Sequence, residues 1–271
     1  YTVGWICALG TELYAARAML DQQYDTRLGE GHDQNFYYRG QIGSRAVVIT
    51  CLPVGETGSD MAAVVAQGMM AKFPNIKIGL MAGIGGGLPH EEHDIKLGDV
   101  VVSKPEGIHG GVVQYDTGKY TTEGFLRTGF LNAPPRELWA VLQSMPAHGH
   151  RLTNNPSETY PREKLDQLYG ADRKEVKRKP GCRAAGPHVF YGTIASGKAL
   201  NKDPAKGGIL IKEHGVLCCE MEATDLMKTT FPCLVIRGIS DYADSYKKGN
   251  WQAYVAASAA RYAKDFLSEI P

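Results

Sequence analysis

The sequence predicts an α/β fold in which one mixed or parallel β-sheet is sandwiched between layers of helices. Strand-length apolar runs alternate with amphipathic helical segments along most of the chain, and this alternation is typical of such a sheet. Several of the runs are apolar at every position, as expected of strands that helices cover on both faces. The length of 271 residues, 43% of them hydrophobic, allows one large domain or two small ones.

The first half of the chain alternates strands with helices. Val3 to Leu9 has the pattern of a buried strand, and the chain turns at Gly10 into an amphipathic helix from Glu12 to Leu20. Two strands around Gly43-Ser44 have the pattern of a hairpin. The remaining elements expected here are strands at 36–40, 45–52, 76–81, 99–103 and 111–116 and a helix at 59–72, which follows a glycine-bracketed loop at 55–58.

The second half begins with a helix that opens at Asn132-Ala133-Pro134-Pro135 and ends near Gln143. Residues 146–183 are rich in prolines and charges, so we expect a solvated excursion that serves as a lid or an oligomer contact. Its basic run, 173–179, is either a solvated face or a contact to a substrate phosphate or an acidic partner. The sheet resumes in strands at 188–196, 217–219 and 233–236, and a helix at 251–267 closes the chain.

Composition excludes several classes of function. A formal net charge of +1 gives no indication of a nucleic-acid or membrane surface. No apolar run approaches the roughly 18 residues of a membrane span, so neither a membrane helix nor a signal peptide is expected in these residues. No Cys/His cluster has zinc spacing, so no metal and no organic cofactor is implied. The cysteines lie mostly in apolar strand-like runs, which favours reduced thiols and a cytoplasmic protein; they are Cys7, Cys51, Cys182, Cys218, Cys219 and Cys233.

The two ends of the chain suggest a piece of a larger protein. The sequence starts at Tyr1, without a methionine and at the edge of a strand, and it stops at Pro271 just after a helix. We therefore expect residues 1–271 to be a single domain of a longer multidomain protein, with its neighbours on the C-terminal side.

Acidic residues follow three of the expected strands. Glu12 lies at the first turn of the first helix, Glu220 and Glu222 follow an apolar run, and Asp241 follows another. Each could be a helix or turn cap. In open α/β sheets, however, ligands bind at the carboxyl ends of the strands, and three acidic strand ends favour one shared site. Carboxylates at such an edge suit a nucleoside, which offers ribose hydroxyls and a basic purine nitrogen.

Gly83-Ile84-Gly85-Gly86-Gly87 is the segment of the chain richest in glycine. It does not open a long helix as GxGxxG does, and no GK[ST] follows, so dinucleotide-binding and Walker-type loops are disfavoured. The acidic Glu91-Glu92-His93-Asp94 comes soon after it and would repel an anion. We expect either a tight turn at a strand end or a turn whose backbone also lines a ligand pocket.

These blocks give the chain a resemblance to the nucleoside phosphorylase-I superfamily, which includes purine nucleoside phosphorylases and methylthioadenosine nucleosidases. The resemblance covers Val3 to about Leu267. It is closest to the phosphorylase-like domains at the N-termini of fungal multidomain proteins that carry NB-ARC, NACHT, ankyrin or tetratricopeptide partners. The blocks that carry it, in family order, are 3–12, 82–88, 97–101, 192–197, 220–223 and 240–241.

The resemblance implies a central mixed, partly barrel-like sheet in a three-layer αβα arrangement, and a homo-oligomer such as a dimer or trimer. It also implies roles for individual residues. Glu222, with Met221, would bind the ribose hydroxyls, Asp241 would protonate purine N7, and Ser240 would orient Asp241. Arg237, on the strand that leads into Asp241, would adjust the acidity of Asp241 without touching the substrate. Further substrate-binding residues by resemblance are Ile84, Gly85, Ala195, Ser196, Leu200 and Asn201, with Leu200 where nucleosidases often have phenylalanine.

The choice between hydrolysis and phosphorolysis depends on where arginines lie. Phosphorylases bind phosphate with arginines, because a multiply charged anion needs charge-assisted donors. The alignment puts Met81 at one such position, and the first loop has no arginine unless Arg17 reaches back. Glu12 instead matches the nucleosidase carboxylate that activates water. This pattern favours a purine nucleosidase that cleaves the N-glycosidic bond of adenosine, AMP or ATP.

Two other functions stay open at this point. One is a phosphate-dependent purine nucleoside phosphorylase, and the other is a nucleoside-sensing module without turnover. The expected partners are the small purine nucleoside or nucleotide itself and C-terminal regulatory domains. Candidate cations for a 5′-phosphate are Lys104, His109, Lys119, Arg127 and the basic run that ends at Lys179.

Overall fold

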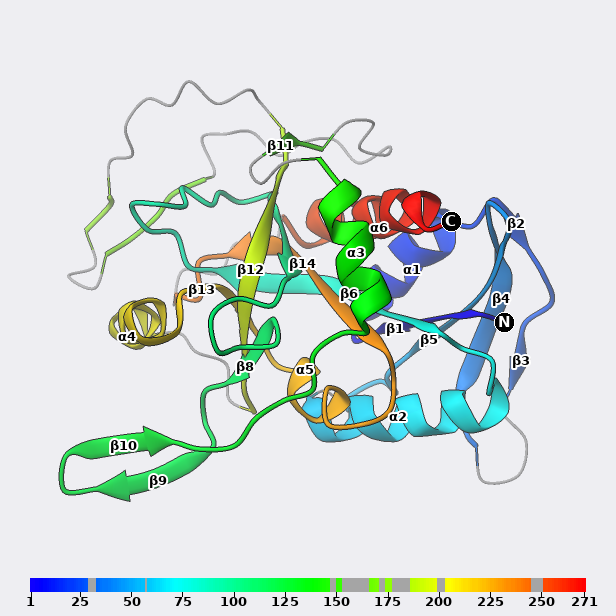
Figure 1. Cartoon of the computed structure of the whole chain (residues 1–271). Coiled ribbons are helices and arrows are strands. Elements are labelled where there is room, and N and C mark those ends of the chain that lie inside the picture. The colour runs from blue at the N-terminus through cyan, green and yellow to red at the C-terminus, as the bar shows by residue number, and fades with distance from the viewer. Residues whose placement is uncertain are drawn as a thin grey trace.

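The computed structural model describes residues 1–28, 33–56, 58–146, 150–152, 166–170, 174–176, 186–198, 203–244 and 251–271. Within these ranges the strands form one 12-stranded mixed sheet and a separate two-stranded hairpin (Figure 1). The strands of the large sheet are β1 (Val3–Cys7), β2 (Gln22–Gln23), β3 (Arg27–Leu28), β4 (Phe36–Ile42), β5 (Arg45–Cys51), β6 (Ile78–Gly87), β7 (Val100–Ser103), β8 (Val112–Gln114), β11 (His150–Arg151), β12 (His188–Ser196), β13 (Val216–Glu220) and β14 (Cys233–Asp241).

Part of the sheet closes on itself, as the resemblance implied. The strands follow the order β11-β12-β7-β14-β6-β1-β5-β4-β2, and β13 pairs with both β12 and β6. Strands β12, β7, β14, β6 and β13 therefore form a closed ring. The pairings of β1 with β5 and β6, and of β14 with β6, are parallel, whereas β13 runs antiparallel to β6. The predicted mixed, partly barrel-like sheet is confirmed.

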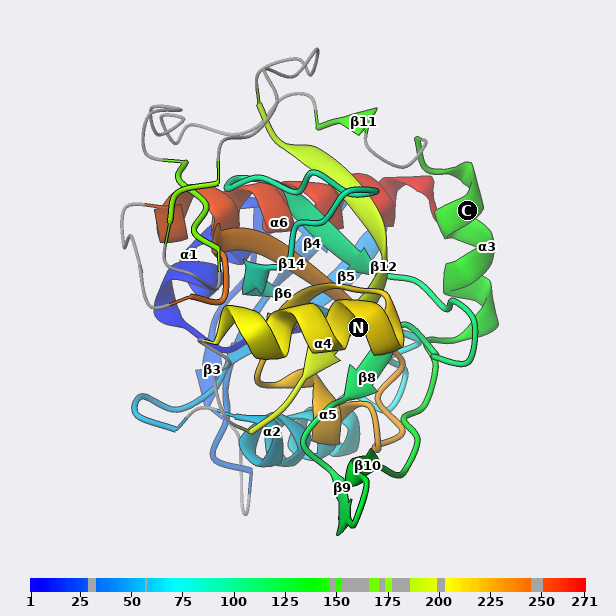
Figure 2. The same ribbon diagram turned by 90° about the vertical axis from the view of Figure 1, so that its left-hand side faces the viewer.

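Helices cover the sheet from two sides. Helices α1 (Gly10–Ala18), α3 (Arg136–Ser144) and α6 (Gln252–Glu269) lie on one side, and α2 (Ser59–Lys72) and α5 (Ala223–Leu226) lie on the other (Figure 1). Helix α4 (Pro204–His214) leads into β13 at one end of the barrel, where the view in Figure 2 faces it. The predicted three-layer arrangement is confirmed.

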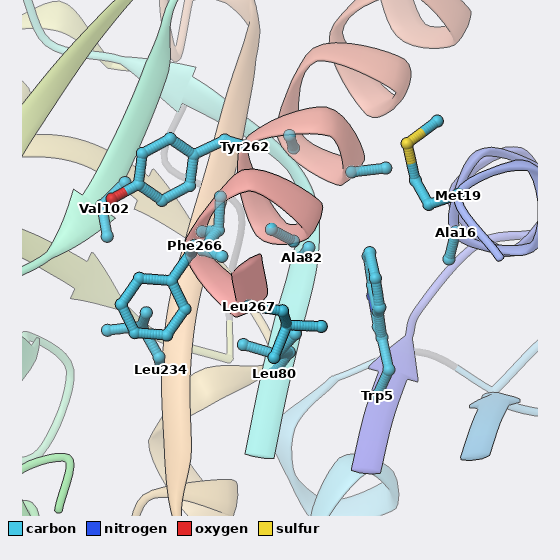
Figure 3. Packing of buried hydrophobic residues seen from close by; sticks show 14 of the residues in the cluster. Trp5, Ala16, Met19, Leu80, Ala82, Val102, Leu234, Tyr262, Phe266 and Leu267 are labelled. Carbon is cyan, nitrogen blue, oxygen red and sulfur yellow. The ribbon is translucent and has the colours of Figure 1, made fainter. Parts of the chain in front are cut away.

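Helix α6 forms the centre of one hydrophobic core. Its Phe266 lies against Leu234 of β14, its Leu267 against Leu80 of β6, and its Tyr262 beside Val102 of β7 (Figure 3). Trp5 of β1 stands in the same layer, facing Ala16 and Met19 from the end of α1 (Figure 3). Since Trp5, Leu80, Leu234, Tyr262 and Phe266 are all fully buried, this packing joins the first and last helices to the strands that carry the acidic residues.

The expected elements agree with the structure in most places, and helix α2 and strand β12 have the predicted bounds. Helix α4 was missed, although it has complete end signals. Asp203 accepts a hydrogen bond from Ala205 N at 3.0 Å, Pro204 opens the first turn, and Gly215 ends the helix with φ of 61°. The hairpin of β9 (Gly118–Thr121) and β10 (Gly124–Arg127) was missed as well.

The glycine run is a correction to the sequence prediction. Gly83 to Gly87 is not a turn, because β6 continues through it and pairs in parallel with β14 as far as Gly86. None of these glycines has a positive φ, so backbone freedom does not explain them. They are required because neighbouring groups occupy the space where a side chain would lie.

Other expectations fall partly outside the described ranges. Most of the excursion at 146–183, and of its basic run, lies there. The cysteines that the structure describes, Cys7, Cys51, Cys218, Cys219 and Cys233, are all free thiols. No helix in the described part of the chain is long and apolar enough to cross a membrane.

The packing of α6 on β14 predicts a steric effect at Gly238. A Cβ atom there would lie 2.2 Å from the carbonyl oxygen of Val255 in α6, so the helix backbone would have to move. We expect Gly238→Ala to lower the free energy of unfolding by about 2 kcal/mol. Gly208→Ala is the control, because Gly208 in α4 has open space around it, and it should gain up to about 1 kcal/mol of helix propensity. Urea unfolding of both variants measures the effect, and equal stabilities would contradict it.

Candidate active site

Glu12 is held at the junction of β1 and α1 by backbone amides. Its Oε2 accepts hydrogen bonds from Ala8 N at 2.7 Å and Leu9 N at 3.0 Å, and its Oε1 accepts one from Ile84 N at 2.8 Å. The side chain is therefore a helix cap, as the simpler reading of the sequence proposed, but it also spans from the first strand to β6. Burial raises the pKa of Glu12, although the nearby charge of Arg237 opposes this shift.

Arg237 of β14 lies fully buried beneath the site. Its Nη2 donates to Glu220 Oε2 at 2.5 Å and lies 3.4 Å from Glu222 Oε2. The Glu220 carboxylate also accepts from the backbone amides of Glu222 and Ala223, each at 3.0 Å. Glu220 is thus the structural member of the acidic pair, since its carboxylate fixes both the arginine and the first turn of α5.

Glu222 sits at the boundary between β13 and α5, where it is the N-cap residue. Its side chain is 12% exposed. Burial raises the pKa of Glu222 to about 7, Arg237 lowers it, and the carboxylates of Glu220 and Glu12 raise it further. With this pKa the Glu222 carboxyl group titrates near neutral pH, whereas an ordinary surface glutamate titrates near its unperturbed pKa.

Asp241 ends strand β14. Its Oδ2 accepts a hydrogen bond from Ser240 Oγ at 3.0 Å, and its Oδ1 accepts one from Ala243 N at 3.0 Å. Ala243 has a φ of 50°, a left-handed conformation that is uncommon for alanine. The two hydrogen bonds fix the orientation of the Asp241 carboxyl group.

The glycines of β6 make room for these side chains. A Cβ atom on Gly83 would lie 2.4 Å from Glu12 Oε1 and 2.7 Å from Arg237 Nη1, and one on Gly86 would lie 2.9 Å from Asp241 Oδ1. Any side chain at either position would displace a carboxylate of the site. The glycine run therefore belongs to the site, as one of the two sequence interpretations held.

One cavity of about 230 Å³ brings the acidic strand ends together. Glu12, Glu222 and Asp241 all line it, as do the predicted Ile84, Gly85, Met221 and Ser240. Glu220 and Gly86 also line the cavity, and Gly86 belongs to the glycine run whose backbone was one expected pocket lining. The remaining lining residues, which the sequence did not single out as substrate-binding, are Ala8, Leu9 and Cys219.

Two predicted residues lie behind this cavity rather than in its lining. Ala195 and Ser196 are fully buried, and Ser196 Oγ accepts hydrogen bonds from Thr224 N at 2.9 Å and Thr224 Oγ1 at 2.7 Å. The reason is that β13 pairs with β12 and places Glu220 opposite Ser196, so β13 supplies the lining there. Leu200 and Asn201 lie outside the described residues.

The described lining of the cavity contains no lysine, arginine or histidine. Met81 is buried in the core, and the guanidinium of Arg17 lies 4.2 Å above the ring of Tyr38, so Arg17 does not reach back to the cavity. Lys104, His109, Lys119 and Arg127 are not among the lining residues. His109 instead packs against His214, with ring centroids 5.1 Å apart.

The raised pKa of Glu222 gives stability a pH dependence of defined sign. The pKa of this carboxyl group is about 7 in the folded protein and 4.5 when unperturbed. Between these values the folded protein keeps a proton that the unfolded chain has released, so rising pH favours unfolding. We expect the free energy of unfolding of the wild type to fall from pH 4.5 to pH 7 relative to that of Glu222→Gln. Urea unfolding of both proteins across this range measures the two free energies of unfolding. If the value for the wild type minus that for Glu222→Gln stays constant or rises with pH, the assignment is contradicted.

Comparison with known proteins identifies relatives of this chain, among them the following three. A nucleotide-binding leucine-rich repeat (NLR)-like protein of Hyaloscypha variabilis is 42% identical over 98% of the chain and 29% of its own length. ATP nucleosidase Cap17 of Escherichia coli is 27% identical over 78% of the chain and 40% of its length. The chain thus spans less than half of either relative. A 5′-methylthioadenosine/S-adenosylhomocysteine nucleosidase of Mycobacterium bovis is 24% identical, with 100% of the chain and 97% of the relative covered.

Solved structures share the fold. The 5′-methylthioadenosine/S-adenosylhomocysteine nucleosidase of Helicobacter pylori superposes with a TM-score of 0.68 at 17% identity, covering 99% of this chain and 98% of the other. The futalosine hydrolase of the same organism gives a TM-score of 0.65 at 18% identity, with 99% and 96% covered. The family model described as the phosphorylase superfamily matches residues 2–269. With nearly the whole length matched and a relative at 42% identity, this chain belongs to the phosphorylase superfamily.

Proposed function

We propose that this domain is a purine nucleosidase, which hydrolyses the N-glycosidic bond of an adenine-type nucleoside or nucleotide to free base and ribose or ribose phosphate. The observation that carries the proposal is the lining of the cavity, where Glu12, Glu222 and Asp241 converge and the described lining includes no lysine, arginine or histidine. Relatives named as nucleosidases support the same class of reaction.

The proposed chemistry assigns one task to each carboxyl group. Asp241, oriented by Ser240, protonates N7 of the purine so that the base leaves as a neutral molecule. Glu222 accepts hydrogen bonds from the ribose hydroxyls. Glu12 takes a proton from the attacking water, and its raised pKa brings it closer to the operating pH of a general base. Water then adds at C1′ as the bond to the base breaks.

Electrostatics favour water over phosphate as the nucleophile. A phosphate ion beside C1′ would lie next to the carboxylates of Glu12 and Glu222. Like charges repel more strongly in a buried site than in water. The guanidinium of Arg237 is already paired with Glu220 at 2.5 Å, so it has little capacity left for an anion. A neutral water molecule avoids this repulsion and gives Glu12 a proton to accept.

The context of the domain is part of the proposal. The NLR-like relative is much longer than this chain, which covers 29% of it, and this supports the prediction that regulatory domains lie next to it in the full protein. ATP, one of the candidate substrates expected from the sequence, is supported by a relative that is named an ATP nucleosidase. The predicted cytoplasmic location and homo-oligomeric state remain predictions.

Product analysis tests the reaction class. The domain is incubated with adenosine, inosine, AMP and ATP, with and without inorganic phosphate, and base release is followed by chromatography. We expect adenine to be released at the same rate without phosphate, and the sugar product to be ribose or a ribose phosphate whose C1 carries a hydroxyl group. Strict dependence on phosphate, with ribose 1-phosphate as product, would identify a phosphorylase instead.

The Asp241→Asn variant separates an enzyme from a sensing module. The amide cannot protonate N7, so we expect kcat to fall about 10²- to 10⁴-fold while the nucleoside still binds. Asp265→Asn is the matched control, because Asp265 pairs with Arg261 on helix α6 at 2.8 Å and does not line the cavity. A wild type that binds the nucleoside without turnover would support the sensing module and overturn the nucleosidase.

The space at Gly83 predicts a second loss of activity. A Cβ atom there would collide with Glu12 Oε1 at 2.4 Å and shift the general base, and misplacement by about 1 Å can reduce turnover about 10²-fold. We expect Gly83→Ala to lower kcat by at least that factor. Gly10→Ala changes a glycine two residues from Glu12 that has open space around it, and its kcat should stay within about threefold of the wild type. Equal activity of the two variants would argue against Glu12 as the base.

A further inference from the structure

The connection from β6 to β7 holds two histidines opposite each other. His90 N donates to His93 O at 3.1 Å, and His93 N donates to His90 O at 3.0 Å. Glu91 and Glu92 therefore form a two-residue turn, and His90 and His93 are a directly opposed pair in an antiparallel bridge. Side chains of such a pair lie on the same face, with Cβ atoms about 5 Å apart.

The turn brings three metal-ligating groups into one place. The two imidazole rings are 5.0 Å apart at 87°. One ring nitrogen of each histidine and a carboxylate oxygen of Glu92 all lie within 4.8 Å of one another. In a tetrahedral zinc site with bonds of about 2.0–2.1 Å, ligand atoms are separated by roughly 3.4 Å. Small rotations of exposed or half-buried side chains would close this gap.

A backbone carbonyl orients one of the imidazoles. His90 Nδ1 lies 3.2 Å from the carbonyl oxygen of Leu88, and a carbonyl can only accept. Nδ1 must then carry the hydrogen, which leaves the lone pair on Nε2 for an ion. Histidines that bind metals typically make this hydrogen bond with the second ring nitrogen.

The surroundings attract a cation and hold the turn in place. Glu91, Glu92 and Asp94 are exposed carboxylates within four consecutive residues, and the carboxylate of Glu106 also interacts electrostatically with His93. Lys96, whose Nζ lies 3.8 Å from Asp94, offsets only part of this charge. The turn is anchored on both sides, because Leu88 and Ile95 are buried.

We propose that His90, Glu92 and His93 form a binding site for a transition-metal ion of the zinc class. Three protein ligands and a water molecule complete the tetrahedron. Two imidazoles favour Zn²⁺, Co²⁺ or Ni²⁺ over Mg²⁺ and Ca²⁺, which prefer oxygen ligands. None of the three residues lines the cavity of Glu12 and Asp241, so the ion would fasten the β6–β7 connection and take no part in glycosidic cleavage.

Cobalt binding tests the site on the domain as it stands. Co²⁺ is titrated into the wild type, visible ligand-field bands are recorded, and Zn²⁺ is then added as competitor. We expect one Co²⁺ per chain with the intensity of a four-coordinate site, displaced by Zn²⁺ and unaffected by excess Mg²⁺. Zn²⁺ should also raise the midpoint of thermal unfolding.

Variants decide whether these residues are the ligands. His93→Ala should weaken Co²⁺ binding at least about 100-fold, and Glu92→Gln at least about 10-fold. Glu92 is exposed, so its replacement keeps the test valid even if His93→Ala folds poorly. Glu91→Gln, which removes the neighbouring charge of the same turn, and His109→Ala, which removes one histidine of the other packed pair, should bind as the wild type does. Unchanged binding by Glu92→Gln and His93→Ala, or no saturable binding by the wild type, would overturn the proposal.

Discussion

The buried guanidinium of Arg237 is the interaction on which the site depends. It is fully buried and within reach of Glu220 and Glu222, and Glu12 lies close enough to act on its charge. Burial alone would lower the pKa of Arg237, but the carboxylates of Glu220, Glu222 and Glu12 raise it above its ordinary value, so the arginine stays charged. Without this cation, the transfer of the carboxylates out of water would cost several kcal/mol per ion. The positive charge therefore allows acidic groups to gather in a cavity whose other described lining is backbone, apolar side chains and Ser240.

Strand β6 gives these groups the space to meet. Its Gly83, Gly85 and Gly86 lie where a side chain would meet Glu12, Arg237 or Asp241, so the strand presents only backbone and Ile84 to the cavity. The Ile84 amide donates to Glu12, so the strand also fixes the orientation of that carboxylate. The strand ends at Gly87, and the chain then continues through Leu88 into the turn of His90 and His93. Strand β6 and the turn that follows it thus connect the proposed catalytic cavity with the proposed metal site.

The protonation behaviour of the site follows from this arrangement. The Glu220 carboxylate accepts hydrogen bonds from Arg237 at 2.5 Å and from two backbone amides. The Glu222 carboxylate lies farther from the guanidinium, at 3.4 Å. Burial therefore dominates for Glu222 and raises its pKa to about 7. The two glutamates are separated by one residue and differ in role because one faces the guanidinium directly. The resemblance assigned a role in ribose binding to Glu222, and the contact with Arg237 shows that Glu220 is the structural one.

The sequence by itself determined the fold class, most of the strands and helices, and the three acidic positions at strand ends. These follow from local patterns. Apolar runs and helical spacing indicate which side chains of a segment are buried, and carboxylates that follow strands indicate the ligand-binding edge of the sheet. The tertiary structure decided what depends on contacts between distant segments. The glycine run is a strand because it pairs with β14, and Gly83 must be a glycine because Glu12 and Arg237 fill the space beside it. Ser196 supports the site from behind because β13 pairs with β12. His90 and His93 face each other because the backbone closes a two-residue turn between them, and no sequence spacing rule for zinc contains that geometry.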